Sequence, residues 1–378
     1  MNFSLKKEIV TKIIGMVEPA LSRNSSLPHL SHIFIEGGDN TISISTTDLD
    51  VSILLSIPTK TKNKKKESLL VDPRVLSGVV SHALSPVVDI QKKGTVLEVK
   101  QKNYKSEIQT MDSDEFPAIS ESQSKDSVCI PSSVFLLALS QVVNSTSSME
   151  TKPELTGMLL HITNNDITLT TTDGFRLSEK KIFQKNVIKE EIKQIIPLKT
   201  VQALLRVFQD SEDDVCITTE ENQVFFQGRV GLINALVVSN IIDGSYPAYE
   251  NIIPKDFTVS FLVNKSNLVE RIRAGSIFSS DSKTIKIDIV DNSMVISSKD
   301  TRTGDFDASL PITIQEQKEG EDTEGVSRLL NYQYVLDGLS NIQDKEIVVR
   351  VSNGPLFLQG SSVQDYLYLL MPINPNNT

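Results

Sequence analysis

Histidines are the first side chains to consider for metal or acid–base chemistry, and this chain of 378 residues has four. His82 and His161 stand apart, whereas His29 and His32 are close enough in sequence to share a metal ion. A zinc site needs at least three protein ligands, and no third candidate lies near this pair beside Pro28. We therefore expect all four imidazoles to be hydrogen-bonded or solvent-facing, with no metal bound.

Three aspartates occur at matching points of the chain, about 125 residues apart: Asp48, Asp173 and Asp300. Each ends a run of alternating β-branched residues and precedes a second strand-like run. One active site would not need three copies of a residue, whereas hydrogen bonding within turns would. The chain also has no Gly-rich phosphate loop, nucleophile elbow or HExxH motif, so the sequence predicts neither an enzyme nor a cofactor.

The two cysteines lie inside apolar, strand-like runs. Cys129 and Cys216 are too few for a disulfide framework or a zinc cluster, so we expect two buried thiols. The first residues show no apolar core after their charges, and no segment has the ~18 apolar residues of a membrane span. The sequence thus predicts a cytoplasmic protein that does not contact membranes.

The aspartate-containing hairpins belong to a larger repeat, in which helices alternate with groups of strands. Apolar residues at helical spacing predict two amphipathic helices in each repeat. The expected fold is α+β, with three tandem repeats of a two-helix, antiparallel-sheet unit. The expected domains are 1–125, 126–253 and 254–378. The six expected helices are 6–21, one from Asp72 onward, 132–144, one from Pro197 onward, 266–278 and 332–339.

Basic residues recur on the expected outer faces of these helices, although the net charge is −10. That net charge argues against a protein that coats nucleic acid with its whole surface. Scattered basic residues usually belong to an ordinary solvated surface. Here they recur on the helices of a repeat, which favours a shared function. If the helices line one concave side, and two chains close a ring head-to-tail, the ring could hold a polyanion without reading its sequence.

Several short motifs closely resemble those of the bacterial sliding clamp family, the beta subunit of DNA polymerase III. They run in the family's order along the whole chain: Leu27-Pro28, Thr46-Thr47-Asp48-Leu49, Asp114-Glu115-Phe116-Pro117, Leu155-Thr156-Gly157-Met158-Leu159, Thr172-Asp173-Gly174-Phe175-Arg176-Leu177, Asp243-Gly244-Ser245-Tyr246-Pro247 and Tyr368-Leu369-Leu370-Met371-Pro372. The resemblance implies the DNA clamp fold and a homodimeric ring. Such a ring encircles duplex DNA and tethers the replicative polymerase, without catalysis.

The resemblance also implies a pocket that takes short extended peptides from the polymerase, the clamp loader and other proteins with a clamp-binding motif. Apolar walls with a polar rim suit a peptide with hydrophobic anchors. The implied pocket residues are Leu155, Thr172, Gly174, Phe175, Arg176, Leu177, Pro247, Ile252, Pro355, Leu369, Met371, Pro372 and Ile373. Without the resemblance, Leu177, Leu369 and Met371 would be taken for core residues.

Two departures from the family's pattern bear on peptide preference: Phe175 stands where His is common, and Ile373-Asn374-Pro375 replaces an ending in Arg.

The implied DNA contacts are Arg23, Lys6, Lys12, Arg74, Lys199, Arg206, Lys265 and Arg271. The implied dimer contacts are Arg74, Ile108, Ile277 and Phe278. The acidic stretch 315–325 is expected to be a loop. A repeat-built interaction scaffold that never closes into a ring is the alternative interpretation.

Overall fold

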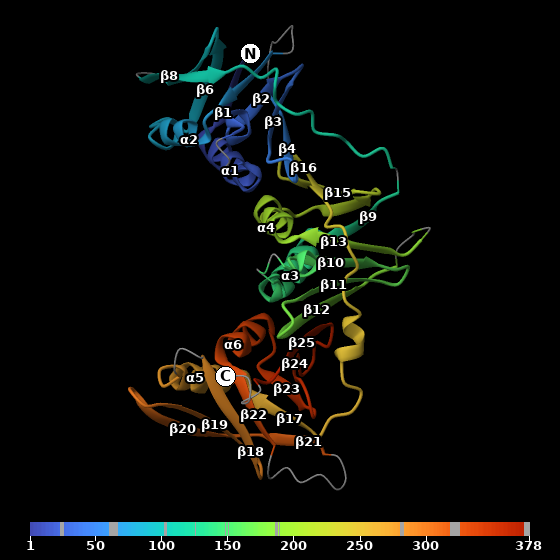
Figure 1. Ribbon diagram of the computed structural model, residues 1–378. Coiled ribbons are helices and arrows are strands. Elements are labelled where there is room, and N and C mark those ends of the chain that lie inside the picture. Colours follow the sequence, from blue (N-terminus) through green and yellow to red (C-terminus); the bar gives the residue numbers. More distant parts are fainter. Residues whose placement is uncertain are drawn as a thin grey trace. The chain divides into compact units, whose positions relative to one another are not determined.

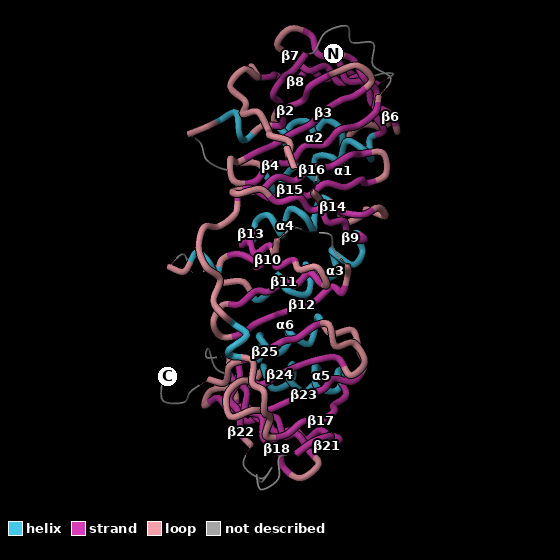
Figure 2. Tube along the Cα trace, turned by 90° about the vertical axis from the view of Figure 1, so that its right-hand side faces the viewer, coloured by secondary structure: helices cyan, strands magenta, loops and turns pink. Residues whose placement is uncertain are grey.

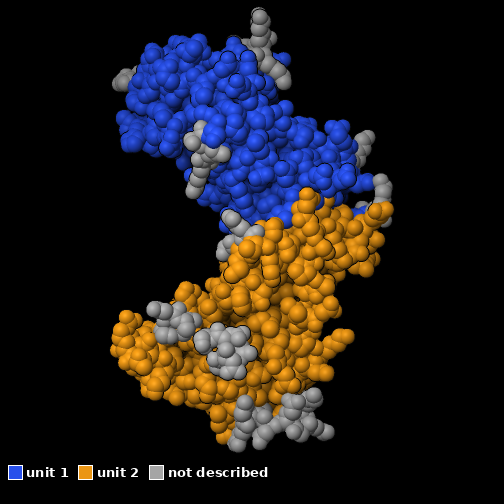
Figure 3. Space-filling view, in the orientation of Figure 1, with its two compact units in different colours: residues 1–139, 186–189, 196–242 blue, residues 140–185, 190–195, 243–378 orange. Residues whose placement is uncertain are grey.

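The computed structural model describes residues 1–373 except 23–25, 60–66, 102–103, 125, 148, 150, 186–187, 189, 280–282 and 318–325. The chain forms two compact units (Figure 3). The first comprises residues 1–139, 186–189 and 196–242, and the second comprises residues 140–185, 190–195 and 243–378. The expected middle domain, 126–253, thus contributes to both units, and the three domain boundaries stay a prediction.

The first unit holds a twelve-stranded sheet. All of its strand pairs are antiparallel, and several of them join strands that are far apart in the sequence, such as β1 with β6 and β4 with β16. In spatial order the strands are β1 (Asn2–Lys6), β6 (Val87–Lys93), β7 (Val96–Gln101), β8 (Tyr104–Met111), β5 (Glu67–Val71), β2 (Ile33–Gly37), β3 (Thr41–Thr47), β4 (Val51–Pro58), β16 (Ile233–Asn240), β15 (Gln223–Val230), β14 (Asp214–Thr219) and β9 (Val128–Pro131).

The second unit holds a nine-stranded and a four-stranded sheet. The nine strands are, in order, β13 (Ile192–Pro197), β10 (Gly157–Ile162), β11 (Asp166–Thr172), β12 (Arg176–Phe183), β25 (Tyr366–Leu370), β24 (Leu356–Gly360), β23 (Glu346–Val351), β17 (Val259–Asn264) and β21 (Thr313–Gln317). The four are β20 (Gly304–Pro311), β19 (Ser293–Asp300), β18 (Thr284–Val290) and β22 (Ser327–Asn331).

All six expected helices are present, and within each unit they lie against one face of the strands (Figures 1 and 2). They are α1 (Lys7–Val17), α2 (Pro73–Ser81), α3 (Ser132–Val142), α4 (Leu198–Val207), α5 (Lys265–Ser276) and α6 (Tyr332–Asn341). Helix α1 buries Val10, Ile13 and Val17, whose spacing of three and four residues makes one apolar stripe. Helix α2 begins where the Asp72 side chain accepts the Arg74 N–H, with Pro73 at the first position.

The three aspartates make the same turn in three hairpins, as the sequence predicted. In each hairpin, one side-chain oxygen accepts two backbone N–H groups at the start of the next strand. Asp48 holds the β3–β4 turn, Asp173 the β11–β12 turn and Asp300 the β19–β20 turn. The repeat is therefore structural: three copies of one hydrogen-bonded Asx turn.

The expectation of two buried thiols is wrong. Cys129 on β9 and Cys216 on β14 lie directly opposite each other in an antiparallel pair and form a disulfide. Both side chains are only partly buried. The sequence did not reveal the pair because the two residues are 87 positions apart and the pairing depends on strand register.

Two further features concern helices and their packing. The rings of Phe135 on α3 and Phe226 on β15 stack 6.1 Å apart in the apolar interior. Such aromatic pairs contribute about 1 kcal/mol beyond the burial of their area. None of the described helices is long and apolar enough to cross a membrane.

Candidate functional site

The four histidines have ordinary structural partners. His32 Nδ1 lies 2.9 Å from the Pro28 carbonyl oxygen, and His82 Nδ1 lies 2.8 Å from that of Gly78. His161 pairs with a glutamate on the neighbouring segment, and His29 lies 4.0 Å from another. Among the residues that the structure describes, no group of three or more His, Cys, Asp or Glu side chains could hold a metal ion.

The residues expected to form a peptide pocket lie in the second unit, and the first of them belong to the β11–β12 turn. Asp173 Oδ1 accepts the N–H groups of Phe175 and Arg176 at 2.9 and 3.0 Å. Thr172 Oγ1 donates to the Arg176 carbonyl oxygen at 2.6 Å, and Gly174 supplies the positive φ of 89° that closes the turn. The turn leaves Phe175 57% exposed at its tip.

The end of β25 lies beside this turn because β12 and β25 are paired. Leu177 lies opposite Leu369, and the Met371 N–H donates to the Phe175 carbonyl oxygen at 2.8 Å. Leu356 pairs with Leu370, so Pro355 and Met371 reach the same end of the sheet. After Met371, Pro372 and Ile373 continue, and the Ile373 N–H donates to the Leu329 carbonyl oxygen at 2.7 Å.

The segment from Asp243 to Ile253 forms another side of the site. The Tyr249 hydroxyl donates to Glu179 Oε2 at 2.6 Å and anchors this segment against β12. Burial, followed by the charge of Glu179, raises the pKa of Tyr249 above its usual range. Near Gly244, the segment passes beside Glu154, which precedes Leu155 at the end of a short 3-10 helix, Pro153–Leu155.

Exposure divides the expected pocket residues into two groups. Leu155, Leu177 and Leu369 are 5%, 0% and 1% exposed and belong to the apolar interior. Phe175, Ile252 and Met371 are 57%, 48% and 39% exposed, and they can meet a ligand directly. Strand pairing and hydrogen bonds bring together the β11–β12 turn and the end of β25, and Tyr249 joins the 243–253 segment to β12. Which of these residues touch a peptide stays a prediction.

Arg176, one of the implied pocket residues, is bound by partners within the second unit. Its Nε lies 2.9 Å from Asp173 Oδ2, its Nη1 lies 2.5 Å from Asp337 Oδ2, and its guanidinium lies 4.2 Å above the Tyr334 ring. Burial alone would lower the pKa of Arg176, but Tyr368 and the carboxylates of Asp337 and Asp173 raise it overall. Arg176 therefore fastens the turn to α6.

Sequence reasoning missed the residues that support the site from a distance. Asp337 and Tyr334 on α6 hold Arg176, and Tyr249 covers Leu177 and Leu369 together with Phe357. The Arg328 guanidinium donates to the Ser352 carbonyl oxygen at 2.5 Å, in the loop that leads to Pro355. An aromatic pair in the motif Asp243-Gly244-Ser245-Tyr246-Pro247-Ala248-Tyr249 was the available signal for Tyr249.

Five of the eight expected DNA contacts have partners in their own unit. Lys12 Nζ lies 2.9 Å from Asp210, Lys199 pairs with Asp48, and Arg206 donates to the Gly15 carbonyl oxygen at 3.1 Å. Lys199 and Arg206 line a cavity of about 880 Å³ between α4 and the segment after α1. Arg74 pairs with Asp72, Lys265 donates to the Ile342 carbonyl oxygen, and Lys6 and Arg271 are exposed. Arg23 lies outside the described residues.

The expected dimer contacts differ in exposure. Ile277 is 68% exposed after α5, and the Phe278 ring stacks 5.9 Å from that of Phe306 on β20. Arg74 has a largely exposed side chain, whereas Ile108 on β8 is only 4% exposed and packs inside the first unit. Asn374 and Pro375, and the acidic stretch from 318 to 325, lie outside the described residues.

Comparisons with known proteins cover nearly the whole chain. Residues 1–120, 129–248 and 250–374 match the N-terminal, central and C-terminal domains of the DNA polymerase III beta subunit. The beta sliding clamps of Bacillus subtilis (strain 168) and Staphylococcus epidermidis (strain RP62A) are 24% and 26% identical in sequence to this chain. Each comparison covers 99% of both chains.

The solved structures give the same fold. The DNA polymerase III beta subunit from Thermotoga maritima superposes with a TM-score of 0.89 and 22% identity, over 99% of both chains. The sliding clamp from Bacillus subtilis has a TM-score of 0.89 and 23% identity, with the same coverage. With one family domain matched to each third of the sequence, the chain has the three-domain clamp fold and belongs to the family of DNA polymerase III beta subunits, the beta sliding clamps.

Proposed function

We propose that the protein is a DNA sliding clamp that acts in the cytoplasm as a homodimeric ring. The ring encircles duplex DNA, tethers the replicative DNA polymerase and performs no catalysis. The observation that carries this proposal is the threefold repeat, in which Asp48, Asp173 and Asp300 make the same turn in three matched hairpins. A repeat of structural turns suits a scaffold that encloses its ligand and does not transform it.

DNA is held by enclosure and by phosphate contacts from the helix faces. The candidates are Lys6, Lys12, Arg23, Arg74, Lys199, Arg206, Lys265 and Arg271. Exposed pairs such as Lys12 with Asp210 contribute little to stability, so the lysine can exchange its carboxylate for a phosphate at small cost. Contacts of this kind weaken as salt rises and carry no sequence preference.

Two chains close the ring head-to-tail. Among the described strands, β20 pairs only with β19, and the part of β8 from Tyr104 to Gln109 pairs only with β7. Each strand therefore has one open edge that can pair with a strand of another chain. Ile277, Phe278 and Arg74 supply side-chain contacts. Ile108, being buried, contributes through its strand and not through an exposed side chain.

Polymerase, clamp loader and other partners dock an extended peptide at the site around Phe175. The exposed apolar side chains of Phe175, Ile252 and Met371 contact the hydrophobic anchors of the peptide. Gly174, Pro247, Pro355, Pro372 and Ile373 shape the walls, and Arg176 holds the turn in place.

Met371→Ala tests this site with little risk to folding, because Met371 is 39% exposed. We expect binding of a clamp-binding peptide to weaken about tenfold or more, as for a hot-spot residue, with an unchanged melting temperature. Val363→Ala is the matched control, since Val363 is 48% exposed and precedes the opposite end of β25. Equal peptide affinity of wild type and Met371→Ala would remove Met371 from the site.

The oligomeric state in solution distinguishes the proposed ring from the alternative, a scaffold that never closes into a ring. We expect sedimentation at micromolar concentration to give roughly twice the chain mass of 41.9 kDa. A strict monomer at that concentration would contradict ring closure and favour the scaffold.

A further inference from the structure

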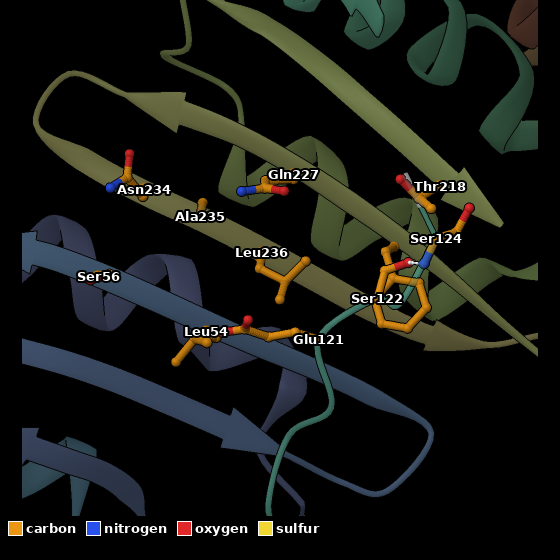
Figure 4. A pocket seen from close by; sticks show the side chains of 11 residues that line it. Leu54, Ser56, Glu121, Ser122, Ser124, Thr218, Gln227, Asn234, Ala235 and Leu236 are labelled. Carbon is orange, nitrogen blue, oxygen red and sulfur yellow. Dashed lines mark hydrogen bonds between the residues drawn. The ribbon is translucent and has the colours of Figure 1, made fainter. Parts of the chain in front are cut away.

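A cavity of about 270 Å³ lies in the first unit, beneath the segment that contains Ser122 (Figure 4). Leu54 and Leu236 line it from β4 and β16, and among its described lining residues only Glu121 is charged. Such a lining favours no single ligand chemistry, because neutral polar groups both donate and accept hydrogen bonds. An unbalanced charge is more selective, and the second unit contains one at Arg328.

Arg328 stands on the apolar face of an edge strand. It belongs to β22, where its side chain lies on the same face as that of Leu330, two residues along, and opposite Ile287 on β18. Leu330 and Ile287 are both buried in the apolar interior of the second unit. The position of Arg328 is therefore one that usually holds an apolar residue, and burial lowers the pKa of its guanidinium.

The guanidinium of Arg328 has only carbonyl partners among the residues that the structure describes. Its Nη1 donates to the Ser327 carbonyl oxygen at 2.8 Å, and its Nη2 donates to that of Ser352 at 2.5 Å. Its Nε is buried without a hydrogen-bond partner in the described part of the chain. Asp288, the acidic residue of the neighbouring strand, pairs with Lys286 at 2.8 Å. A partly buried cation without a carboxylate is costly, so an added carboxylate should bind to it well.

Arg328 is hydrogen-bonded next to two residues of the proposed peptide site. The Ile373 N–H donates to the carbonyl oxygen of Leu329, the neighbour of Arg328, at 2.7 Å. Ser352, which accepts from Arg328, donates through its hydroxyl to the Pro355 carbonyl oxygen at 2.8 Å. A peptide that contacts Ile373 and Pro355 therefore passes beside the Arg328 guanidinium.

We propose that Arg328 selects partner peptides that carry a carboxylate beside their hydrophobic anchors. This inference rests on the proposed peptide site and specifies its ligand further. The carboxylate accepts from guanidinium N–H groups that the bonds to Ser327 and Ser352 do not use. An acidic side chain and the C-terminal carboxylate of a peptide both have the required chemistry.

Three short peptides with the same leucine and phenylalanine anchors test the preference. They are acetyl-Asp-Leu-Phe-Asp-amide, its neutral counterpart acetyl-Asn-Leu-Phe-Asn-amide, and acetyl-Asn-Leu-Phe-Asn with a free C-terminal carboxylate. NMR titration of the full-length protein, followed at the Met371 methyl group, gives each dissociation constant and locates the peptide. We expect at least one carboxylate peptide to bind about tenfold more tightly than the neutral one at low salt, with a smaller difference at high salt. Whichever peptide gains identifies the source of the carboxylate.

Three variants show whether Arg328 causes the preference. Arg328→Gln should bind the carboxylate and neutral peptides equally, with the affinity for the neutral peptide unchanged from wild type. Arg328→Lys keeps the positive charge and should retain most of the preference, which a purely structural role would not predict. Arg302→Gln is the matched control, because it removes one positive charge at an exposed position on the β19–β20 turn. It should keep the full preference.

The outcomes separate this inference from the proposed peptide site. A carboxylate preference that survives in Arg328→Gln would overturn the role of Arg328. Equal binding of all three peptides to wild type, weakened by Met371→Ala, would overturn the preference and leave the site standing. If no peptide shifts the Met371 methyl group, the proposed site fails, and the inference fails with it.

Discussion

Arg176 shows how one side chain connects separate parts of the second unit. Its guanidinium contacts Asp173 in its own turn and Asp337 on α6, 161 residues away in sequence. With the side chain 12% exposed, the positive charge is largely matched inside the protein. In the proposed peptide site, Arg176 would therefore position the turn that carries Phe175.

Arg176→Ala is expected to destabilise the protein as well as weaken peptide binding. Removing the guanidinium leaves two carboxylates close together without their shared partner, so we expect a loss of about 1–3 kcal/mol in the free energy of unfolding. Urea denaturation measures this loss. Arg271→Ala, on the exposed face of α5, is the control and should change stability by less than about 0.5 kcal/mol. Equal urea midpoints for both variants would contradict a positioning role.

Glu98 on β7 lies among lysines that lower its pKa. Its side chain is fully buried, and hydrogen bonds from Lys100 and Lys93, with a further one from Lys105, lower its pKa from 4.5 to about 2. A carboxyl group with a lowered pKa stabilises the fold above pH 4.5, and that contribution is lost as pH falls from 4.5 toward 2.

Glu98→Gln should accordingly be less stable than wild type at pH 7, and the difference should shrink as pH falls from 4.5 toward 2. Thermal melting at a series of pH values provides the measurement. Glu107→Gln is the control, because Glu107 is half exposed and pairs with Lys105 at 2.5 Å. A stability difference between wild type and Glu98→Gln that stays constant from pH 7 to pH 2 would show that the lysines do not stabilise the charged form.

Individual residues were predictable from sequence only where their partners are local. The turn role of Asp48, Asp173 and Asp300 followed from repetition, and their bonds reach only two or three residues along the chain. The pairing of Arg176 with Asp337 did not follow, because it depends on how α6 packs against β12 and β25.

At the scale of elements, helix packing depends on small residues at close contacts. A Cβ atom at Gly338 on α6 would come within 2.3 to 2.8 Å of the buried Tyr368 ring on β25. Gly78 on α2 has open space at the same position. The same substitution should therefore have opposite effects in the two helices.

Gly338→Ala should lower the free energy of unfolding by about 1–3 kcal/mol, the usual cost of overpacking. Gly78→Ala should raise it by about 1 kcal/mol, because alanine favours the helix. Chemical denaturation of wild type and of both variants measures the direction of each change in the free energy of unfolding. Stabilisation by Gly338→Ala would mean that α6 and β25 are not in close contact.

Elements were largely predictable, and connections between distant elements were not. The periodicity of apolar residues identified all six helices and the three repeated hairpins, because these patterns are local. The disulfide between β9 and β14 and the cavity beneath Ser122 both depend on the register of strands far apart in sequence. Neither the disulfide nor the cavity can be recognised from a single stretch of the sequence.

At the scale of the whole molecule, the affinity for DNA and the retention on DNA have different physical origins in the proposed function. Basic helix residues that already have partners, such as Lys12 and Lys199, give only weak and salt-sensitive contacts with phosphates. A net charge of −10 further disfavours adhesion to DNA. In the proposed function, long residence on DNA therefore comes from a closed ring around the duplex.

Retention on DNA of different topology tests this central claim most directly. The protein is loaded onto nicked circular DNA with its clamp loader, half of the sample is cut once with a restriction enzyme, and protein that stays with the DNA is measured by gel filtration at moderate salt. We predict that the protein stays with the circle and is lost from the linear DNA by sliding off its ends. Equal loss from both forms would contradict enclosure as the basis of binding.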